Sequence, residues 1–164
     1  MAAALLAATS VYVPGMLFGA PEKRIDLAAV ISPSDAASAL GEPVKDAQSR
    51  NSEETDGYYS RCNYYSQNPG KSLVLRIRQA AAAQLEPRKQ LEELSATNGK
   101  MKTINGLGEK AALLNDPAGN GVSNLMLYVA KGNAFVTVGL GGIDDEKVAL
   151  EKARALARKI LAQL

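Results

Sequence analysis

The chain has 164 residues, of which 46% are hydrophobic and 22% charged, a composition typical of a globular protein. Its net charge of +2, with no run of Lys or Arg, argues against nucleic-acid binding. The absence of histidine excludes His-dependent catalytic triads and imidazole metal sites, and the single cysteine, Cys62, excludes an internal disulfide. We therefore predict no cofactor, no metal and no catalytic residue.

The N-terminal segment, residues 1–21, carries no charged side chain. Its apolar stretch is interrupted by Pro14 and Gly15, whereas a membrane-spanning helix needs about 20 unbroken apolar residues. This pattern favours a signal peptide over residues 1–20 and a periplasmic or secreted protein. An uncleaved membrane anchor and an ordinary cytosolic N-terminus are the alternatives. Residues 25–164 are predicted to form a single α+β domain.

The first elements of this domain have clear boundary residues. Ser32 and Pro33 are typical of a helix N-terminus and Gly41 of a helix end, so we expect a helix between them. A strand over residues 44–49 and a polar loop over residues 50–57 are predicted to follow.

Two stronger strands come next, Tyr58–Gln67 and Lys71–Gln79, joined by a turn at residues 68–70. A second helix is expected from about Pro87 to Thr97. The remaining predicted elements are strands near residues 110–114, 124–130 and 134–139, turns at 116–121 and 131–133, and a last helix from about residue 144. In that helix, Ala149, Ala153, Leu156 and Ile160 form an apolar stripe.

The element order favours an α+β fold: an antiparallel sheet of about five or six strands with two or three helices packed on it. The strings Ala39–Glu42 and Gly106–Glu109 share the pattern of small residue, Leu, Gly and Glu, and each is preceded by a helix and followed by three strands. This similarity suggests an internal repeat of a helix plus a three-strand unit.

The sequence resembles the small exported domains of actinobacterial lipoproteins of unknown function and the extracellular sensor domain of mycobacterial serine/threonine kinases. The resemblance is carried by residues 39–44, Cys62–Tyr64, residues 106–111 and the closing segment 153–164. It implies an antiparallel sheet flanked by helices and a binding or sensing role outside the cytoplasm. Such domains often hold paired cysteines, whereas Cys62 has no second cysteine to pair with.

Two local motifs have a functional and a structural interpretation. Residues 106–111 match the dinucleotide fingerprint G-x-G-x-x-A, but they lack the full following helix, so a structural turn is favoured. Cys62 lies beside Arg61, which could activate the thiol, but a small buried hydrophobic side chain is the favoured interpretation.

The candidate ligand-binding residues lie on the central strand pair. Alternation puts Tyr59, Arg61 and Tyr65 on one face of the first strand, and Arg76 with Arg78 on one face of the second. If the register joins the two sets, they form an aromatic and cationic surface suited to a small anion, a sugar or a peptide carboxylate. The structural alternative is a solvated sheet face with cross-strand Tyr–Arg contacts.

The predicted function is therefore a non-enzymatic extracytoplasmic binding or sensor-like domain for a small anionic or sugar ligand. The alternative is a structural or assembly module that binds a cell-envelope protein through a sheet edge. A hydrolase that uses carboxylates ranks third, because Glu92 and Glu93 are adjacent on a helix and point in different directions. No nucleic acid is expected as a partner, and contact with a membrane only through an uncleaved leader.

Overall fold

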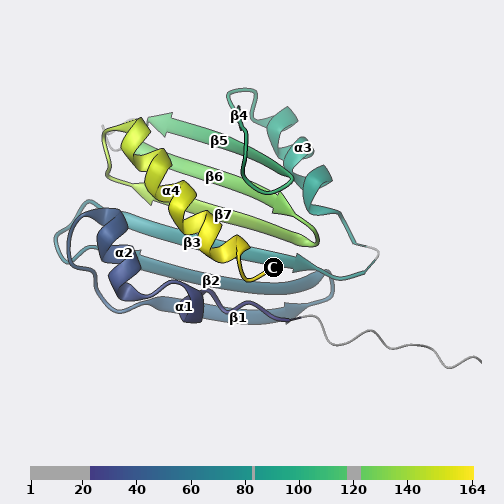
Figure 1. Cartoon of the computed structure of the whole chain (residues 1–164), viewed down its shortest axis with the longest axis horizontal. Helices are drawn as coiled ribbons and strands as arrows, with labels where there is room; N and C mark the ends of the chain where they lie inside the picture. The colour runs from purple at the N-terminus through teal and green to yellow at the C-terminus, as the bar shows by residue number, and fades with distance from the viewer. Residues whose placement is uncertain (1–22, 83, 118–122) are drawn as a thin grey trace, which may run out of the picture.

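The computed structural model describes residues 23–82, 84–117 and 123–164, so the predicted signal peptide over residues 1–20 lies outside the described residues. Seven antiparallel strands form one sheet with the order β1-β2-β3-β7-β6-β5-β4 (Figure 1). The strands are β1 (Gln48–Glu54), β2 (Gly57–Tyr65), β3 (Ser72–Ala80), β4 (Lys102–Ile104), β5 (Lys110–Pro117), β6 (Ser123–Lys131) and β7 (Ala134–Gly141).

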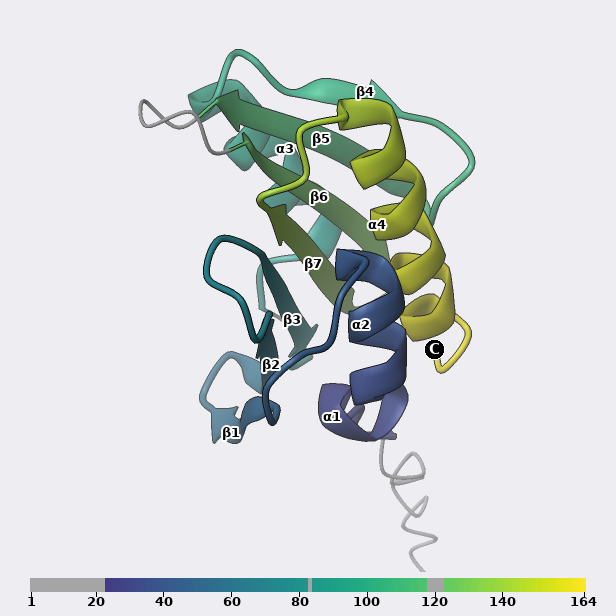
Figure 2. The ribbon, with the colours of Figure 1, turned by 90° about the vertical axis from the view of Figure 1, so that its left-hand side faces the viewer.

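The helices divide between the two faces of the sheet. Three of them, α1 (Leu27–Val30), α2 (Pro33–Leu40) and α4 (Glu146–Leu161), cover one face, and α3 (Pro87–Thr97) packs on the other, against β5, β6 and β7 (Figure 2). This confirms an α+β fold with an antiparallel sheet and three substantial helices. No helix in the described ranges is both long enough and apolar enough to cross a membrane.

The main core lies between the sheet and the three helices. The predicted apolar stripe of α4 is confirmed, since all four of its residues are buried in this core. Cys62 and Tyr64 of β2 point into the same core and are fully buried, so the interpretation of Cys62 as a small buried side chain is confirmed. Burial raises the pKa of the Cys62 thiol, which disfavours the reactive thiolate.

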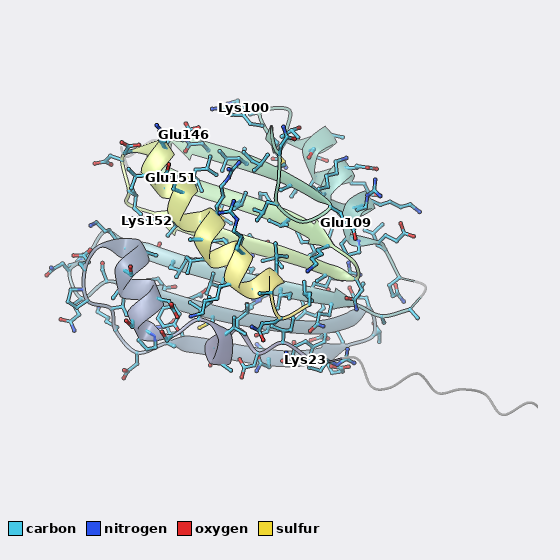
Figure 3. The ribbon with its side chains drawn as sticks, in the orientation of Figure 1. Lys23, Lys100, Glu109, Glu146, Glu151 and Lys152 are labelled. Atoms are coloured by element: carbon cyan, nitrogen blue, oxygen red, sulfur yellow. The ribbon has the colours of Figure 1, made fainter. Side chains whose placement is uncertain are left out.

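Polar contacts at the rim tie α4 to its neighbours. Lys152 of α4 lies beside the end of α2, where its ammonium group donates to the Ala39 carbonyl oxygen at 2.7 Å (Figure 3). Glu146, in the first turn of α4, lies 3.0 Å from Lys102 of β4 and accepts a hydrogen bond from Asn115 of β5. These contacts join α4 to α2 at one point and to β4 and β5 at another.

The strand order places a three-strand meander (β1, β2 and β3) beside a four-strand meander (β4, β5, β6 and β7). In each, consecutive strands pair with each other, and the two meanders meet where β3 pairs with β7. The helix before the first meander, α2, and the helix before the second, α3, lie on opposite faces of the sheet. The suggested internal repeat stays a prediction.

The prediction of a strand over residues 44–49 and a loop over residues 50–57 is wrong. The first strand runs from Gln48 to Glu54, and Val44 forms only an isolated bridge with Ser66. Almost every residue of β1 is exposed, because β1 is an edge strand. An edge strand open on both faces needs no apolar alternation, so its sequence resembles that of a loop.

Three smaller differences complete the comparison. The sheet has seven strands, one more than expected, because the three-residue strand β4 was not predicted. The four-residue helix α1 was not predicted either. Strand β5 continues through Asp116 and Pro117 into the predicted turn at residues 116–121, of which 118–121 lie outside the described residues. Short elements of this kind are too brief to show a hydrophobic period.

Of the fingerprint-like residues, 110 and 111 already belong to β5, and 106–109 form a bend, in keeping with the structural interpretation. They lead into β5 and not into a helix, so no helix N-terminus is present to hold a pyrophosphate. Gly108 has a φ of 60°, and a Cβ atom built there would lie 2.6 Å from the Ala130 carbonyl oxygen. The glycine is needed for a close approach of two backbones.

Candidate ligand-binding site

The five predicted site residues all lie on the sheet face that carries α3. Residues of β2 alternate between the faces, so Tyr59, Arg61 and Tyr65 point away from the main core that buries Cys62 and Tyr64. The register of β2 and β3 pairs Tyr59 with Arg78 and Arg61 with Arg76. Because directly paired residues lie on the same face, the structure brings these four together as the alternation predicted.

Arg61 and Arg76 belong to a row of paired residues that crosses the whole sheet. Arg50 of β1 is paired with Arg61, so three arginines lie side by side on three adjacent strands. The row continues through β7, β6, β5 and β4 toward the opposite edge. From β1 to β4 it consists of Arg50, Arg61, Arg76, Thr137, Tyr128, Ala112 and Thr103.

The three arginines of this row have exposed side chains. Within residues 23–82, 84–117 and 123–164, no carboxylate lies within the 4.0 Å of an ion pair with any of their guanidinium groups. Like charges directly opposite each other in a sheet are destabilising. These three residues, which we call the arginine row (Arg50, Arg61 and Arg76), therefore concentrate positive charge over β1, β2 and β3. Glu54 and Asp56 line the hollow beside Arg50 and Arg61 without forming an ion pair with either of them.

A pocket of about 340 Å³ lies beside the arginine row, where α3 approaches the sheet. Its charged side is formed by arginines of β2 and β3, and its apolar side by Leu94 of α3 with Met126, Tyr128 and Phe135. The complete lining is Tyr59, Ser60, Arg61, Arg76, Ile77, Arg78, Gln90, Leu94, Met126, Tyr128, Phe135 and Thr137. We call this space the α3 pocket.

The aromatic rings of the α3 pocket are fixed in place. Tyr128 and Phe135 stack with their centroids 6.1 Å apart and their planes 27° from parallel. Leu91 anchors α3 in a small buried cluster with Phe135 and the alanines of β5 and β6. Burial raises the pKa of the Tyr128 hydroxyl, and the positive charge of Arg76 acts in the opposite direction. The positive charge of Arg76 therefore acts on the Tyr128 hydroxyl, and both residues line the pocket.

Arg78 differs from the arginine row because its guanidinium group is buried and already engaged. Nη1 donates to the Gln90 side chain at 2.9 Å and to the Leu85 carbonyl oxygen at 3.1 Å. Nε lies 3.3 Å from Asp56 Oδ2, and Nη2 donates to the Asp56 carbonyl oxygen at 3.3 Å. Arg78 therefore joins the β1–β2 turn and α3 to the sheet.

Tyr59 belongs to the same network, since its hydroxyl donates to Asp56 Oδ2 at 2.6 Å. This hydrogen bond lowers the pKa of Asp56, and burial with the neighbouring carboxylate raises the pKa of Tyr59. The Tyr59 hydroxyl is committed to holding Asp56, so the ring, and not the hydroxyl, is what Tyr59 offers to the pocket.

Tyr65 lies on the same face but away from the α3 pocket. It is 37% exposed and is paired with Ser72 at the far end of the hairpin. Four residues of a strand span about 13 Å, so Tyr65 is that far along β2 from Arg61. The structure therefore does not bring Tyr65 to the arginines.

Several residues of the site were missed from the sequence. Arg50 was assigned to a loop, and the apolar side of the pocket comes from α3, β6 and β7, which are distant in sequence from the hairpin. Arg50 also lines a second hollow of about 460 Å³ over β1 and β2, which shares Tyr59 and Arg61 with the α3 pocket. Alternation in β6 and β7 could have placed Tyr128 and Thr137 on one face, but no sequence signal showed that this face joins the arginines.

Of the two glutamates considered for hydrolysis, Glu92 is engaged elsewhere, and so is Asp145 at the start of α4. Glu92 lies 2.9 Å from Lys110, and Asp145 caps α4 by accepting from the backbone N–H groups of Lys147 and Val148. No described carboxylate is among the residues that line the α3 pocket. The pocket can attract and orient an anion, but its described side chains include no acid that could act as a general base.

The chain matches no protein-family model, and no curated protein is significantly similar to it. The candidate site is therefore interpreted from its own geometry and charge.

Proposed function

We propose that the chain is a non-enzymatic ligand-binding or sensor-like domain that works outside the cytoplasm and recognises a small molecule with an acidic group. The observation that carries this proposal is the arginine row, three exposed guanidinium groups on adjacent strands with no described carboxylate paired to them. Guanidinium groups bind carboxylates and phosphates through two parallel hydrogen bonds, which suits an acidic ligand.

The energetic argument concerns the cost of leaving the arginine row unpaired. A like-charge pair directly opposite in a sheet costs about 0.2–1 kcal/mol, and the row contains two such pairs, Arg50 with Arg61 and Arg61 with Arg76. Proteins keep such locally unfavourable arrangements where function requires them. An anion bound between the arginines would convert the repulsion into attraction.

The test is isothermal titration of the full-length chain at low salt with succinate, inorganic phosphate and glucose. We expect the two anions to bind and glucose to give no heat, because the arginine row supplies charge and the tyrosines are dispersed. The double variant Arg61→Gln/Arg76→Gln should lose at least about tenfold in anion affinity, the value of one charged hydrogen bond.

Arg158→Gln is the matched control, because Arg158 is an exposed arginine in the last turn of α4, on the opposite face of the sheet. It should bind the anions as the unaltered chain does. The proposal would be contradicted if neither anion binds. It would also be contradicted if the double variant binds the anions with the same affinity as the unaltered chain. Binding of glucose in place of the anions would favour a sugar ligand.

Export is tested separately by mass spectrometry of the chain recovered from its native host. We expect a mature N-terminus near residue 20 in the periplasmic or secreted fraction, because residues 1–21 have the pattern of a signal peptide. An intact Met1 in the cytosolic fraction would contradict export and leave the anion site unaffected.

The second candidate function, assembly with a cell-envelope protein, is favoured by the open edge at β1. This strand is seven residues long and exposed along nearly its whole length, so its outer edge can accept a strand from a partner. Hydrogen exchange in the presence of such a partner should show added protection of β1 and none of β7, which lies inside the sheet. Unchanged exchange in β1 would exclude edge pairing.

A further inference from the structure

We propose that the ligand is an amphipathic acid, whose acidic group binds Arg61 and Arg76 and whose single apolar chain or ring occupies the α3 pocket. This inference rests on the proposed anion-binding function and goes beyond it by assigning the other half of the ligand. A single ligand can contact both features, because the charged arginines and the apolar lining lie side by side on the same row of residues.

The order of residues along the row supports the proposal. From the β1 edge inward, the row changes from arginine, through Thr137, to the aromatic ring of Tyr128 beneath α3. Neighbouring strands are about 4.8 Å apart, so the step from Arg76 to Tyr128 spans about 10 Å. A ligand lying across the strands therefore meets charge at one end and an apolar surface at the other.

The size of the α3 pocket limits the apolar part of the ligand. At about 340 Å³ it lies near the lower end of the range for small-molecule sites. This space suits one chain or one ring system and not the paired chains of a membrane lipid. Leu94 is only partly buried, so the α3 side of the pocket offers apolar surface that the fold itself does not cover.

The acidic group is assigned to Arg61 and Arg76 because Arg78 is already engaged. All three line the pocket, but the guanidinium group of Arg78 is held by Asp56, Gln90 and the Leu85 carbonyl. Arg61 and Arg76 face each other across β2 and β3 with exposed side chains. An acid placed between them receives hydrogen bonds from both while its chain points toward Tyr128.

The test is a chain-length series on the full-length chain: hexanoate, octanoate and decanoate below their micelle concentrations, with affinity measured by titration calorimetry. Each buried methylene should raise the affinity by up to about fourfold. Nonyltrimethylammonium has the same alkyl tail and the opposite charge, and it should bind at least about tenfold more weakly than decanoate. Amide NMR shifts should move at Thr137 and Tyr128.

Variants separate the two ends of the ligand. Arg61→Gln/Arg76→Gln should weaken every acid by at least about tenfold, for the loss of a charged hydrogen bond. Leu94→Ser should reduce the gain in affinity for each added methylene and leave the affinity for hexanoate almost unchanged. Leu164→Ser is the matched control, because Leu164 is an exposed leucine that neither lines the pocket nor contacts the groups that hold Arg78.

Each outcome has a distinct meaning. If acids bind through the arginines with no gain from chain length, this inference is overturned and the proposed function stands. If no acid binds, both fail. If a gain with chain length survives the arginine variant and Leu94→Ser, the tails bind elsewhere, for example to the apolar residues 1–21, and the inference is overturned.

Discussion

Lys159, in the last turn of α4, lies 2.7 Å from the Asp35 carboxylate in the first turn of α2. The same carboxylate oxygen accepts hydrogen bonds from the backbone N–H and the hydroxyl of Ser32, at 2.8 and 2.7 Å. One side chain thus caps α2 and joins it to α4.

We expect Asp35→Ala to lower the free energy of unfolding by about 1–2 kcal/mol, because the reciprocal cap of α2 and the contact to α4 are both lost. Lys159→Gln removes only the partly exposed ion pair and should cost less than about 1 kcal/mol. Urea denaturation measures both values. Equal losses for the two variants would show that the cap contributes nothing.

The pH dependence of stability should report the same carboxylate. The hydrogen bonds from Lys159 and Ser32 lower the pKa of Asp35 from 3.8 to about 2. Because the folded state binds this proton less readily than the unfolded chain, the stabilisation is present above about pH 4 and is lost as the pH falls toward 2. In Asp35→Asn this part of the acid destabilisation should disappear. Parallel curves of unfolding free energy against pH for the two proteins would contradict the assignment.

Arg76 and Arg78, two residues apart on one strand face, should respond in opposite ways to the same substitution. Arg78→Gln should lower the free energy of unfolding by about 1–3 kcal/mol, because the partly buried acceptors at Asp56, Leu85 and Gln90 lose their charged donor. Arg76→Gln relieves repulsion from Arg61 and should leave stability unchanged or raise it by up to about 1 kcal/mol. Thermal denaturation at low salt distinguishes them. A destabilised Arg76→Gln protein would mean that Arg76 has a structural role.

The Cys62 thiol should resist alkylation in the folded protein. It is fully buried in the main core, and burial raises its pKa, so both access and thiolate formation are disfavoured. Labelling by iodoacetamide should proceed at the rate of global unfolding and accelerate in urea together with the loss of circular dichroism. Rapid labelling without denaturant would contradict the burial of Cys62.

Sequence reasoning predicted the elements that bury one clear apolar face. The stripe of α4 and the alternation of β2 and β3 have the periods that a helix and a half-buried strand require, and the structure confirms them. Ser32 and Gly41 marked both ends of α2 because capping is a local interaction. The prediction for the segment of β1 was wrong because an exposed edge strand carries no such period in its hydrophobic residues.

The candidate site was predicted only in part, for a physical reason. Alternation placed Arg61 and Arg76 on one face, and the short hairpin made their pairing accessible from the sequence. The apolar half of the pocket requires β7 to pair with β3 and α3 to pack on the face opposite α4. These are long-range choices that local patterns do not encode. Nor could the pattern show that Arg78 is engaged, since its partners Asp56 and Gln90 lie in a turn and on α3.

The pairing of β3 with β7 has a consequence for synthesis. The first meander is made early, but the inner strand that completes its pairing, Ala134–Gly141, leaves the ribosome only after α3, β4, β5 and β6. Until then the edge of β3 that pairs with β7 stays open. Truncation before residue 134 would leave that edge permanently open to other chains.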